Sequence, residues 1–432
     1  MSISTNRRRF VVGGSALAAS AAIWTHTSPA TAQDSTTITW WHITTQEDLQ
    51  PIMQAAADGF MEQNPGLQIE ITVLENEAFK SKLATSMQSG EPPDVFQSWG
   101  GGVLYEYANA GLVRDITEQL AQDGWGDSFV PSALALYGQD GQTFGVPWRT
   151  GMIGVWYRKS LFEQAGIEAP PETWTEFLET VETLKGAGIT PISLGEGDKW
   201  PGHFYWCYLA IRNGGQEAFE AAYSGEGSFA DEPFVKAGQD LQQLIELEPF
   251  QSGFLGATYP DASTIFANAG AAMELMGHWS PSNMDGLAED PEAMRADLGW
   301  FPFPVVEGGA GLPTDVLGGG DGFAIGANAD DLAVEFVRYM TSLEMQRDWA
   351  AQGFAVPPTV LGAEDAVTDQ NLIPVMEALA NATYFQLYYD QFLPPAVAGV
   401  VLDETQALIA GQQSPEGVAE AIAASFQQEM GS

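Results

Sequence analysis

Cysteine and basic residues are the scarcest groups in this chain of 432 residues, and each scarcity narrows what the protein can be. Its one cysteine, Cys207, has no partner for an intramolecular disulfide, and we interpret it as a small buried hydrophobic residue. Lys and Arg number 16 against 57 Asp and Glu, a formal net charge of −41. Because phosphate backbones and anionic lipid surfaces bind clustered cations, this composition disfavours nucleic acid and membrane surfaces as partners.

The acidic residues are scattered along the chain, which predicts a solvated acidic surface and not an acidic tail. Such a surface repels itself at low ionic strength and stays soluble at high salt, so a salt-tolerant source is a hypothesis. We expect added NaCl to raise the thermal midpoint of unfolding, because counterions screen this repulsion. Unfolding at low salt that added salt does not reverse would contradict the hypothesis.

Long apolar runs are missing beyond the N-terminus, where no segment is long and apolar enough to cross a bilayer. At the N-terminus, the sequence NRRRF at 6–10 precedes a run of apolar and small residues at 11–23 and an A-x-A site at 30–32. This order is typical of a twin-arginine export signal, here residues 1–33, that is removed; an ordinary secretory signal is the alternative. No cysteine lies near the cleavage site, so no lipid anchor is expected. We therefore predict a soluble protein that is periplasmic or extracellular.

The N-terminal third of the mature chain alternates strand and helix patterns. Strands are expected at 36–41, 67–74 and 94–96, and helices at 49–61 and 79–87. This order predicts a parallel α/β sheet, in which ligands bind at the carboxyl ends of the strands. Those ends carry Trp41 and His42, then Gln97 and Trp99. Between strand and helix, TTQE at 44–47 has the spacing of a helix capping box.

Residues 143–159 form the segment at which we expect the chain to leave one domain for another. Pro147 removes a backbone donor and fixes φ, so we do not expect a central strand to pass through it. A short buried strand is predicted after it, at 152–157. The glycine-rich stretch at 318–325 is interpreted as the return crossing. Since 432 residues exceed one ordinary core, two crossings predict a hinge between two domains.

The rest of the chain shows no internal repeat and no low-complexity tract. A loop rich in aromatic residues is expected at 199–206, and the tail at 371–430 is expected to be mostly helical. The other predicted elements are strands at 190–194 and 271–276 and helices at 103–110, 174–185, 234–246, 263–270, 332–340 and 344–352.

Several short motifs occur in the order and spacing of a known family. They are Asn64-Pro65-Gly66, Pro93-Asp94-Val95, FGVP at 144–147, WYRKSLF at 156–162, Pro171-Glu172-Thr173-Trp174, MGHW at 276–279 and Gly319-Gly320. Each motif alone is weak, but together they run nearly from end to end. The chain resembles the extracellular solute-binding proteins of bacterial ABC importers, in the carbohydrate-binding group.

The resemblance implies a type II periplasmic-binding-protein fold of class α/β, with two lobes that are each a mostly parallel sheet flanked by helices. It implies a first lobe of about residues 34–147 and 322–366 and a second lobe of 148–321 and 367–432. A sugar would bind between the lobes, and closure about the hinge would present the loaded protein to the transmembrane subunits of an ABC permease. We expect a monomer that has no catalytic residues and needs no cofactor or metal.

Sugars present apolar C–H faces and many hydroxyls, so aromatic faces and planar polar side chains hold them. Trp279 matches a position where the family stacks a sugar, although core packing is the alternative. The loop reading makes His203 and Trp206 candidates, unless they form a buried plug. Arg149 either grips adjacent hydroxyls or pairs with an acid. The full set of predicted ligand-binding residues is Trp41, His42, Glu77, Lys80, Gln97, Trp99, Trp148, Arg149, His203, Trp206, His278, Trp279, Asp321, Tyr384, Gln386 and Tyr388.

Three alternatives remain open at this point. The three histidines of the mature chain could suggest a metal site, but none are at metal-ligand spacing. A secreted glycoside hydrolase would need two positioned carboxylates, and 57 acids leave that possible by composition. The same fold could bind a compatible solute, a peptide or a polyamine, because aromatic cages also hold cations. Among sugars, the aromatic segments favour a disaccharide or short oligosaccharide over a monosaccharide.

Overall fold

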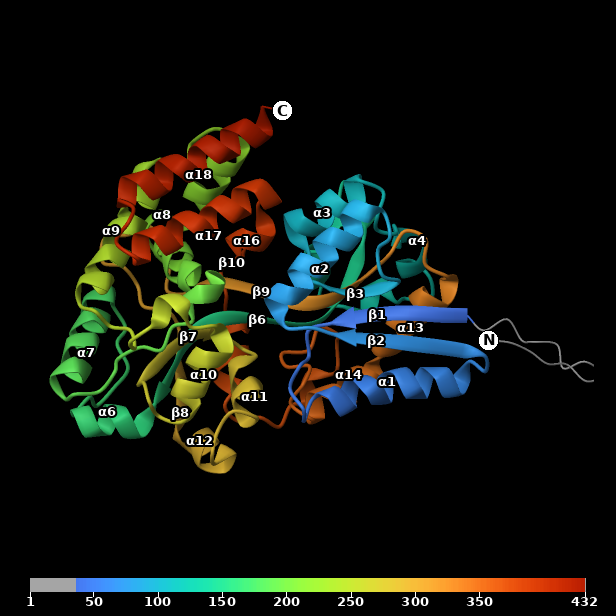
Figure 1. Cartoon of the computed structure of the whole chain (residues 1–432), viewed down its shortest axis with the longest axis horizontal. Helices are drawn as coiled ribbons and strands as arrows, with labels where there is room; N and C mark the ends of the chain where they lie inside the picture. The colour runs from blue at the N-terminus through green and yellow to red at the C-terminus, as the bar shows by residue number, and fades with distance from the viewer. Residues whose placement is uncertain (1–35, 432) are drawn as a thin grey trace, which may run out of the picture. The chain divides into compact units, whose positions relative to one another are not determined.

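A mixed sheet runs through the part of the chain that the computed structural model describes, residues 36–431 (Figure 1). Its strand order is β2-β1-β3-β9-β6-β7, with β10 paired to β9 and β8 paired to β6. The predicted export signal at 1–33 lies outside the described residues. The strands are β1 (Thr36–His42), β2 (Leu67–Val73), β3 (Val95–Ser98), β6 (Gly145–Arg158), β7 (Met273–Gly277), β8 (Leu298–Phe301), β9 (Asp315–Ile325) and β10 (Tyr384–Leu387), with a separate hairpin of β4 (Gly138–Gln139) and β5 (Gln142–Thr143).

Strand direction differs between the two ends of this sheet. β1 pairs in parallel with both β2 and β3, as the alternation of strand and helix predicts. β9 instead runs antiparallel to β3 and to β6, and β6 runs antiparallel to β7 and β8. The expected predominance of parallel pairs therefore holds for β2-β1-β3, and the sheet as a whole is mixed.

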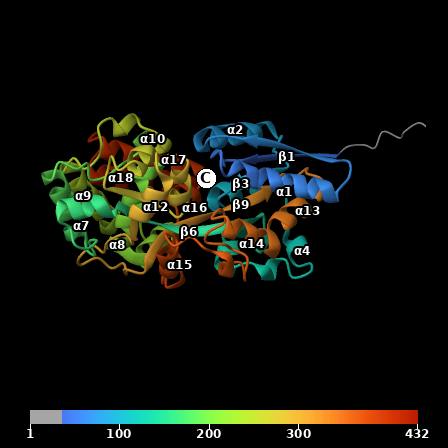
Figure 2. The ribbon, with the colours of Figure 1, turned by 90° about the horizontal axis from the view of Figure 1, so that it is seen from below.

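Helices cover the sheet on both sides of its central strands (Figures 1 and 2). The helices are α1 (Gln50–Gln63), α2 (Asn76–Ser89), α3 (Gly101–Asn109), α4 (Thr117–Leu120), α5 (Pro131–Ala135), α6 (Lys159–Ala165), α7 (Trp174–Gly186), α8 (Trp200–Ser224), α9 (Glu232–Glu246), α10 (Tyr259–Ala267), α11 (Ser280–Asp285), α12 (Pro291–Asp297), α13 (Asp331–Met340), α14 (Leu343–Ala351), α15 (Ile373–Ala380), α16 (Tyr389–Phe392), α17 (Pro395–Ile409) and α18 (Pro415–Met430), with 3-10 turns at Gly126–Ser128, Glu196–Asp198, Phe254–Gly256 and Glu364–Ala366.

The expectation that no central strand passes through Pro147 is wrong. β6 runs for 14 residues across it, and Pro147 itself pairs with Gly322 of β9. The register of the pair shifts between Pro147 and Arg149, as at a β-bulge. A bulge interrupts the ladder locally, so the missing N–H of a proline is tolerated there.

The glycines of β9 are explained by close neighbours. A Cβ at Gly319 would overlap the ring of Tyr388, and one at Gly322 would overlap the hydroxyl end of Tyr137. A Cβ at Gly320 would overlap the backbone oxygen of Arg149 on β6. The glycine-rich stretch therefore lets aromatic rings and a neighbouring strand approach the sheet, independently of any role as a hinge.

Buried apolar side chains gather in one large cluster and two smaller ones within residues 36–431. The large cluster is drawn mainly from 152–317 and 372–426, and the smaller two from 38–148 and 323–360. Figure 1 shows the corresponding groups of elements on either side, with β6 and β9 running between them. We call the elements around the large cluster (152–317 and 372–426) the second-core side. We call the elements around the two smaller clusters (38–148 and 323–360) the first-core side.

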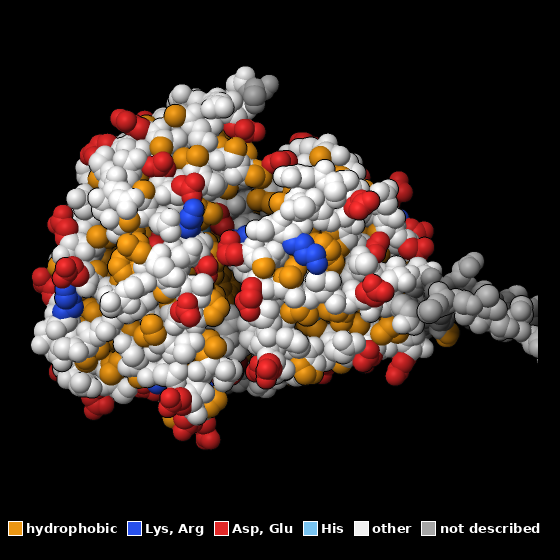
Figure 3. All heavy atoms as spheres, in the orientation of Figure 1, with side chains coloured by type: hydrophobic (Ala, Val, Ile, Leu, Met, Phe, Trp, Pro, Cys, Tyr) orange, Lys and Arg blue, Asp and Glu red, His pale blue; other side chains and the backbone are white. Residues whose placement is uncertain are grey.

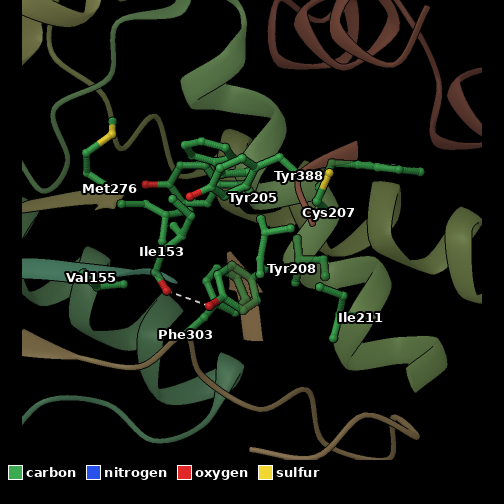
Figure 4. Close-up of a cluster of buried hydrophobic side chains, with 14 of the residues drawn as sticks. Ile153, Val155, Tyr205, Cys207, Tyr208, Ile211, Met276, Phe303 and Tyr388 are labelled. Atoms are coloured by element: carbon green, nitrogen blue, oxygen red, sulfur yellow. Dashed lines mark hydrogen bonds between the residues drawn. The ribbon is translucent and has the colours of Figure 1, made fainter. Parts of the chain in front are cut away.

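The interior of the large cluster is tightly packed aromatic and aliphatic material (Figure 4). The ring of Tyr208 stacks on Phe303 with centroids 4.6 Å apart, and its hydroxyl donates to the Ile153 carbonyl oxygen at 2.6 Å. Cys207 is fully buried here and forms no disulfide, which confirms the expected burial of this side chain.

Four local predictions were wrong. The segment at 199–206 is not a loop, because α8 begins at Trp200 with Pro201 in its first turn, a favoured place for proline. The segment at 384–387 is the strand β10, in line with its aromatic, β-favouring composition. TTQE at 44–47 caps no helix, since α1 begins at Gln50 without a side-chain cap. The strand expected at 190–194 is reduced to isolated bridges at Ile192.

Within the described residues, none of the helices has both the length and the apolar character needed to cross a membrane.

Candidate functional site

A cavity of about 680 Å³ lies at the carboxyl ends of β1, β2 and β3. Its first-core side is lined by residues that follow these strands, including the segment 43–49, Glu75 and Trp99. Arg149 and Asp321 line it from the central strands β6 and β9. Its second-core side is lined from α8, α10, α11 and α16. In the space-filling view the molecule is hollowed between the two sides (Figure 3). The predicted position of the site at the strand ends matches this cavity.

Aromatic rings form most of the second-core wall. Trp200 contacts Trp279 and Tyr259, with ring centroids 6.4 Å and 4.9 Å away. Tyr388 stands edge-on to Trp279 at 6.3 Å, and Phe204 packs on Tyr388 at 5.3 Å. Flat, partly apolar rings of this kind suit a ligand with apolar faces and polar edges.

Trp99 supplies an aromatic face on the first-core side. Its ring contacts Phe79 edge-on at 5.9 Å, and Lys80 Nζ lies 5.7 Å from the ring centroid. Lys80 in turn pairs with Glu77 on the same helix, Nζ to Oε1 at 3.0 Å. The cavity therefore has aromatic residues on two opposed sides.

His278 faces the cavity with unused hydrogen-bonding capacity. The side chain is 1% exposed, and neither Nδ1 nor Nε2 has a hydrogen-bond partner among the described residues. Burial, followed by the nearby Arg149 charge, lowers the pKa of His278 well below its ordinary value. The ring is therefore neutral at physiological pH and offers one donor and one acceptor to a ligand.

The position of the His278 ring depends on a glycine in the neighbouring strand. A Cβ at Gly151 of β6 would overlap Nδ1 and the ring carbons of His278. We expect Gly151→Ala to displace the ring, to lower the free energy of unfolding by about 1–3 kcal/mol and to weaken ligand binding several-fold. Calorimetric titration and thermal unfolding measure the two effects. Gly399→Ala is the matched control, because nothing lies within 4 Å of a Cβ there; equal effects at both sites would contradict the prediction.

Arg149 and Asp321 form an ion pair between the central strands β6 and β9 beside the cavity. Arg149 Nε lies 2.5 Å from Asp321 Oδ2, and Gln97 Nε2 donates to Asp321 Oδ1 at 2.5 Å. The guanidinium also lies over the Trp148 ring, 4.5 Å from its centroid. The salt-bridge alternative for Arg149 is thus realised, while both members of the pair still line the cavity.

A second buried pair supports the opposite wall. His203 Nε2 lies 3.3 Å from Asp390 Oδ1, and His203 Nδ1 contacts the Trp200 carbonyl oxygen at 2.5 Å. Although burial opposes the charge on His203, Cys207 and the Asp390 carboxylate raise the pKa of His203 to about 10. Burial likewise opposes ionisation of Asp390, but His203 lowers its pKa to about 2. Asp390 lines the cavity and His203 lies behind it.

Two further carboxyl groups are buried near the second-core wall. Glu274 on β7 accepts hydrogen bonds from Ser263 Oγ at 2.8 Å and Ser280 Oγ at 2.7 Å, and so connects α10 with α11. Burial raises the pKa of Glu274 to about 7, although the two hydrogen bonds favour the charged carboxylate and by themselves lower the pKa. Burial also raises the pKa of Glu196 to about 8, against His203 and a hydrogen bond from the Gly202 N–H.

These two pKa values predict how stability depends on pH. Because the folded protein binds both protons more tightly than the unfolded chain does, their contribution is present below about pH 4.5 and is lost as pH rises through 7 to 8. We expect the free energy of unfolding to fall by about 5 kcal/mol between pH 5.5 and 8.5, about 2 from Glu274 and about 3 from Glu196, measured by denaturant titration. Glu274→Gln should flatten this dependence, and an unchanged slope in that variant would contradict the assignment.

Half of the predicted ligand-binding residues line the cavity together: Lys80, Trp99, Trp148, Arg149, His278, Trp279, Asp321 and Tyr388. Trp148 is also part of the interior, 1% exposed and stacked on Phe354 at 4.7 Å.

The other eight predicted residues lie outside the lining. Trp206 is fully buried and stacks on Phe234 at 6.1 Å, and His203 is buried behind Asp390. His42 packs beside Trp40 at 4.9 Å, and burial lowers its pKa to about 4. Of the remaining five, Trp41 has its ring under Lys82, and Glu77 pairs with Lys80. Gln97 donates to Asp321, and Tyr384 and Gln386 belong to β10.

Sequence reasoning missed several lining residues. The segment 43–49 follows β1, and for 44–47 the sequence predicts only a turn with a helix cap. Trp200 and Phe204 are not predicted as ligand-binding residues, because the sequence analysis interprets their segment as a loop. In the helix α8, their spacing of four residues places them on one face. The others carry no motif of their own and include Tyr259, Asn283 and Asp390. Among residues 36–431, no group of three or more His, Cys, Asp or Glu side chains is arranged to hold a metal ion.

The fold and the site define a class of protein. The family described as bacterial extracellular solute-binding protein matches residues 44–347, and the chain belongs to that family. Its fold is the type II periplasmic-binding-protein fold, a two-lobed α/β arrangement.

Two of the three similar proteins described next have sugar binding in their names. The chain is 25% identical over 343 residues to the multiple sugar-binding protein of Streptococcus mutans, covering 75% of this chain and 76% of the relative. A solved chitin oligosaccharide binding protein is 25% identical, with a TM-score of 0.85, and covers 92% of this chain and 100% of its own. A structure from a study of xylan utilization by the thermophilic bacterium Caldanaerobius polysaccharolyticus is 29% identical, with a TM-score of 0.83, covering 90% and 99%.

Proposed function

We propose that this chain binds a disaccharide or short oligosaccharide in the cavity and delivers it to an ABC permease. The observation that carries the proposal is an aromatic-walled cavity with buried polar atoms that have no hydrogen-bond partner within residues 36–431: the His278 ring nitrogens, Trp200 Nε1 and the Tyr388 hydroxyl. Leaving such atoms unpaired costs about 1–3 kcal/mol each, so hydroxyls that satisfy them contribute to affinity. The names of the relatives support a sugar as the ligand.

Binding would couple to a hinge motion between two lobes. We assign residues 34–147 and 322–366 to the first lobe and 148–321 and 367–432 to the second, in keeping with the separate buried clusters. The crossings then lie in β6 and β9, where Pro147 and Arg149 bracket the register shift. A ligand that touches both walls would favour the closed form.

The proposed setting is outside the cytoplasm. The sequence at 1–33 would direct export and be removed, and the mature chain would act as a monomer that carries sugar without chemical change. Its partners would be the transmembrane subunits of an ABC permease, which are separate chains.

A ligand screen tests this proposal. Thermal shift followed by calorimetry should find that a neutral sugar from a panel of maltose, cellobiose, xylobiose and diacetylchitobiose raises the melting temperature, because such a ligand binds the folded state alone. Spermidine and betaine serve as the non-sugar arms. Binding of these and of no sugar would overturn the sugar assignment, and release of shorter products from the bound oligosaccharide would identify a hydrolase.

A further inference from the structure

Some of the charged side chains that line the cavity have an ion-pair partner, and others do not. Its two lining cations are already paired, Arg149 with Asp321 at 2.5 Å and Lys80 with Glu77 at 3.0 Å. On the second-core wall, Asp285 pairs with Arg295 at 2.6 Å and Asp390 with His203 at 3.3 Å. No lining cation is therefore left for a negatively charged ligand.

Three lining carboxylates remain without an ion-pair partner among the described residues. Glu47 and Asp48 lie in the segment between β1 and α1, and Glu75 lies immediately before α2. All three are exposed at the first-core rim, where water screens them without removing their attraction for a cation. Asp48 also reaches toward the opposite wall, with Oδ1 3.9 Å from the Cβ position at Gly286.

Independent features of the same cavity favour a ligand that is bound inside it. The His278 ring is buried and lines the cavity, and neither ring nitrogen has a hydrogen-bond partner among residues 36–431. A ligand in the cavity can therefore form a hydrogen bond with it. Trp99 and Trp279 present ring systems to the cavity, and the faces of such rings attract cations. A carboxylate-bearing ligand would meet three unpaired carboxylates and only cations that already have an ion-pair partner, whereas an amine would meet those carboxylates and aromatic rings.

We propose that the site selects sugars by charge, binding oligosaccharides of amino sugars with free, protonated amines more tightly than neutral ones and rejecting those that contain uronic acids. This inference rests on the proposed function and narrows its ligand class. The attraction is electrostatic and partly exposed, so it raises the rate of association and depends on salt.

The test uses three versions of one sugar. The neutral disaccharide with the largest thermal shift is compared with its 2-amino-2-deoxy analogue and its 6-carboxylate analogue, by calorimetry at 50 mM and 500 mM NaCl. We expect the amine to bind roughly tenfold tighter than the neutral parent at low salt, with the ratio shrinking at high salt, and the carboxylate to bind at least roughly tenfold weaker. An amine that binds no tighter than the parent, or a carboxylate that binds equally well, overturns the inference.

Variants separate the rim from the general acidity of the protein. The triple change Glu47→Gln, Asp48→Asn, Glu75→Gln should reduce the ratio of amine to neutral affinity to about twofold or less. The matched control Glu168→Gln, Glu179→Gln, Glu182→Gln removes the same charge from exposed positions outside the cavity lining and should leave the ratio unchanged. Equal ratios in both triples would overturn the inference, while failure of every sugar in the panel to bind overturns the proposed function instead.

Discussion

Alanine in place of Trp279 is expected to lower affinity for the best-binding oligosaccharide about 100-fold, a loss of about 2.8 kcal/mol. The indole stands between Trp200, His278 and Tyr388 and is half-buried before any ligand binds. A sugar face packed on it would bury most of the remaining ring surface, which alanine cannot replace. Isothermal titration calorimetry measures the change.

The indole occupies this place because Gly277 has no side chain. A Cβ at Gly277 would overlap the six-membered ring of Trp279. Trp279→Phe keeps an aromatic face and should recover most of the lost affinity. Trp300→Ala is the matched control, since Trp300 is also half-buried and packs on Trp156 at 6.4 Å without lining the cavity. If both alanine variants bind equally well, Trp279 does not stack on the ligand.

Removal of the His203 imidazole is expected to cost about 3–5 kcal/mol of folding free energy at neutral pH. His203→Leu would leave the Asp390 carboxylate, 7% exposed, without its counterion. The pKa of Asp390 would then rise, because burial alone favours the neutral acid. Stability of this variant should therefore improve as the pH falls and Asp390 takes up a proton, which denaturant titrations at pH 5 and 7.5 measure.

The double variant His203→Leu, Asp390→Leu provides the control for that prediction. With both charges removed, stability should return to within about 1–2 kcal/mol of the natural chain, since apolar replacement of a buried pair is often close to neutral. The thermodynamic cycle isolates the coupling between the two side chains. Additive single effects would show that His203 acts through packing alone.

Prediction from the sequence succeeded where the signal was local and periodic. Alternation of β-favouring and helical segments was sufficient for β1, β2, β3 and the helices between them. The rule that ligands bind at the carboxyl ends of parallel strands then placed Trp99 at the cavity. The helix expected at 174–185 is α7, which begins at Trp174.

Prediction failed where a residue's role depended on which side of an element faced the cavity. In α8, Trp200 and Phe204 line it, while His203 and Trp206 on other faces of the same helix are buried. Because the segment is interpreted as a loop, no helical periodicity separates the side chains that face the cavity from those that face the interior. His203 and Trp206 are therefore predicted in place of Trp200 and Phe204. On β1, Trp40 and His42 point to the same side because side chains alternate along a strand, and neither Trp41 nor His42 lines the cavity.

The sequence by itself determined the class of this protein: the order of its elements, its family motifs, its acidity and its abundance of tryptophan are all readable residue by residue. The tertiary structure decided which polar side chains of the cavity have a hydrogen-bond or ion-pair partner within the protein and which do not. Arg149 is paired with Asp321, which Gln97 also contacts from β3, and the His278 ring, which has no hydrogen-bond partner among residues 36–431, fits beside β6 because Gly151 has no side chain. Such pairings join residues more than 100 positions apart, and no local pattern records them.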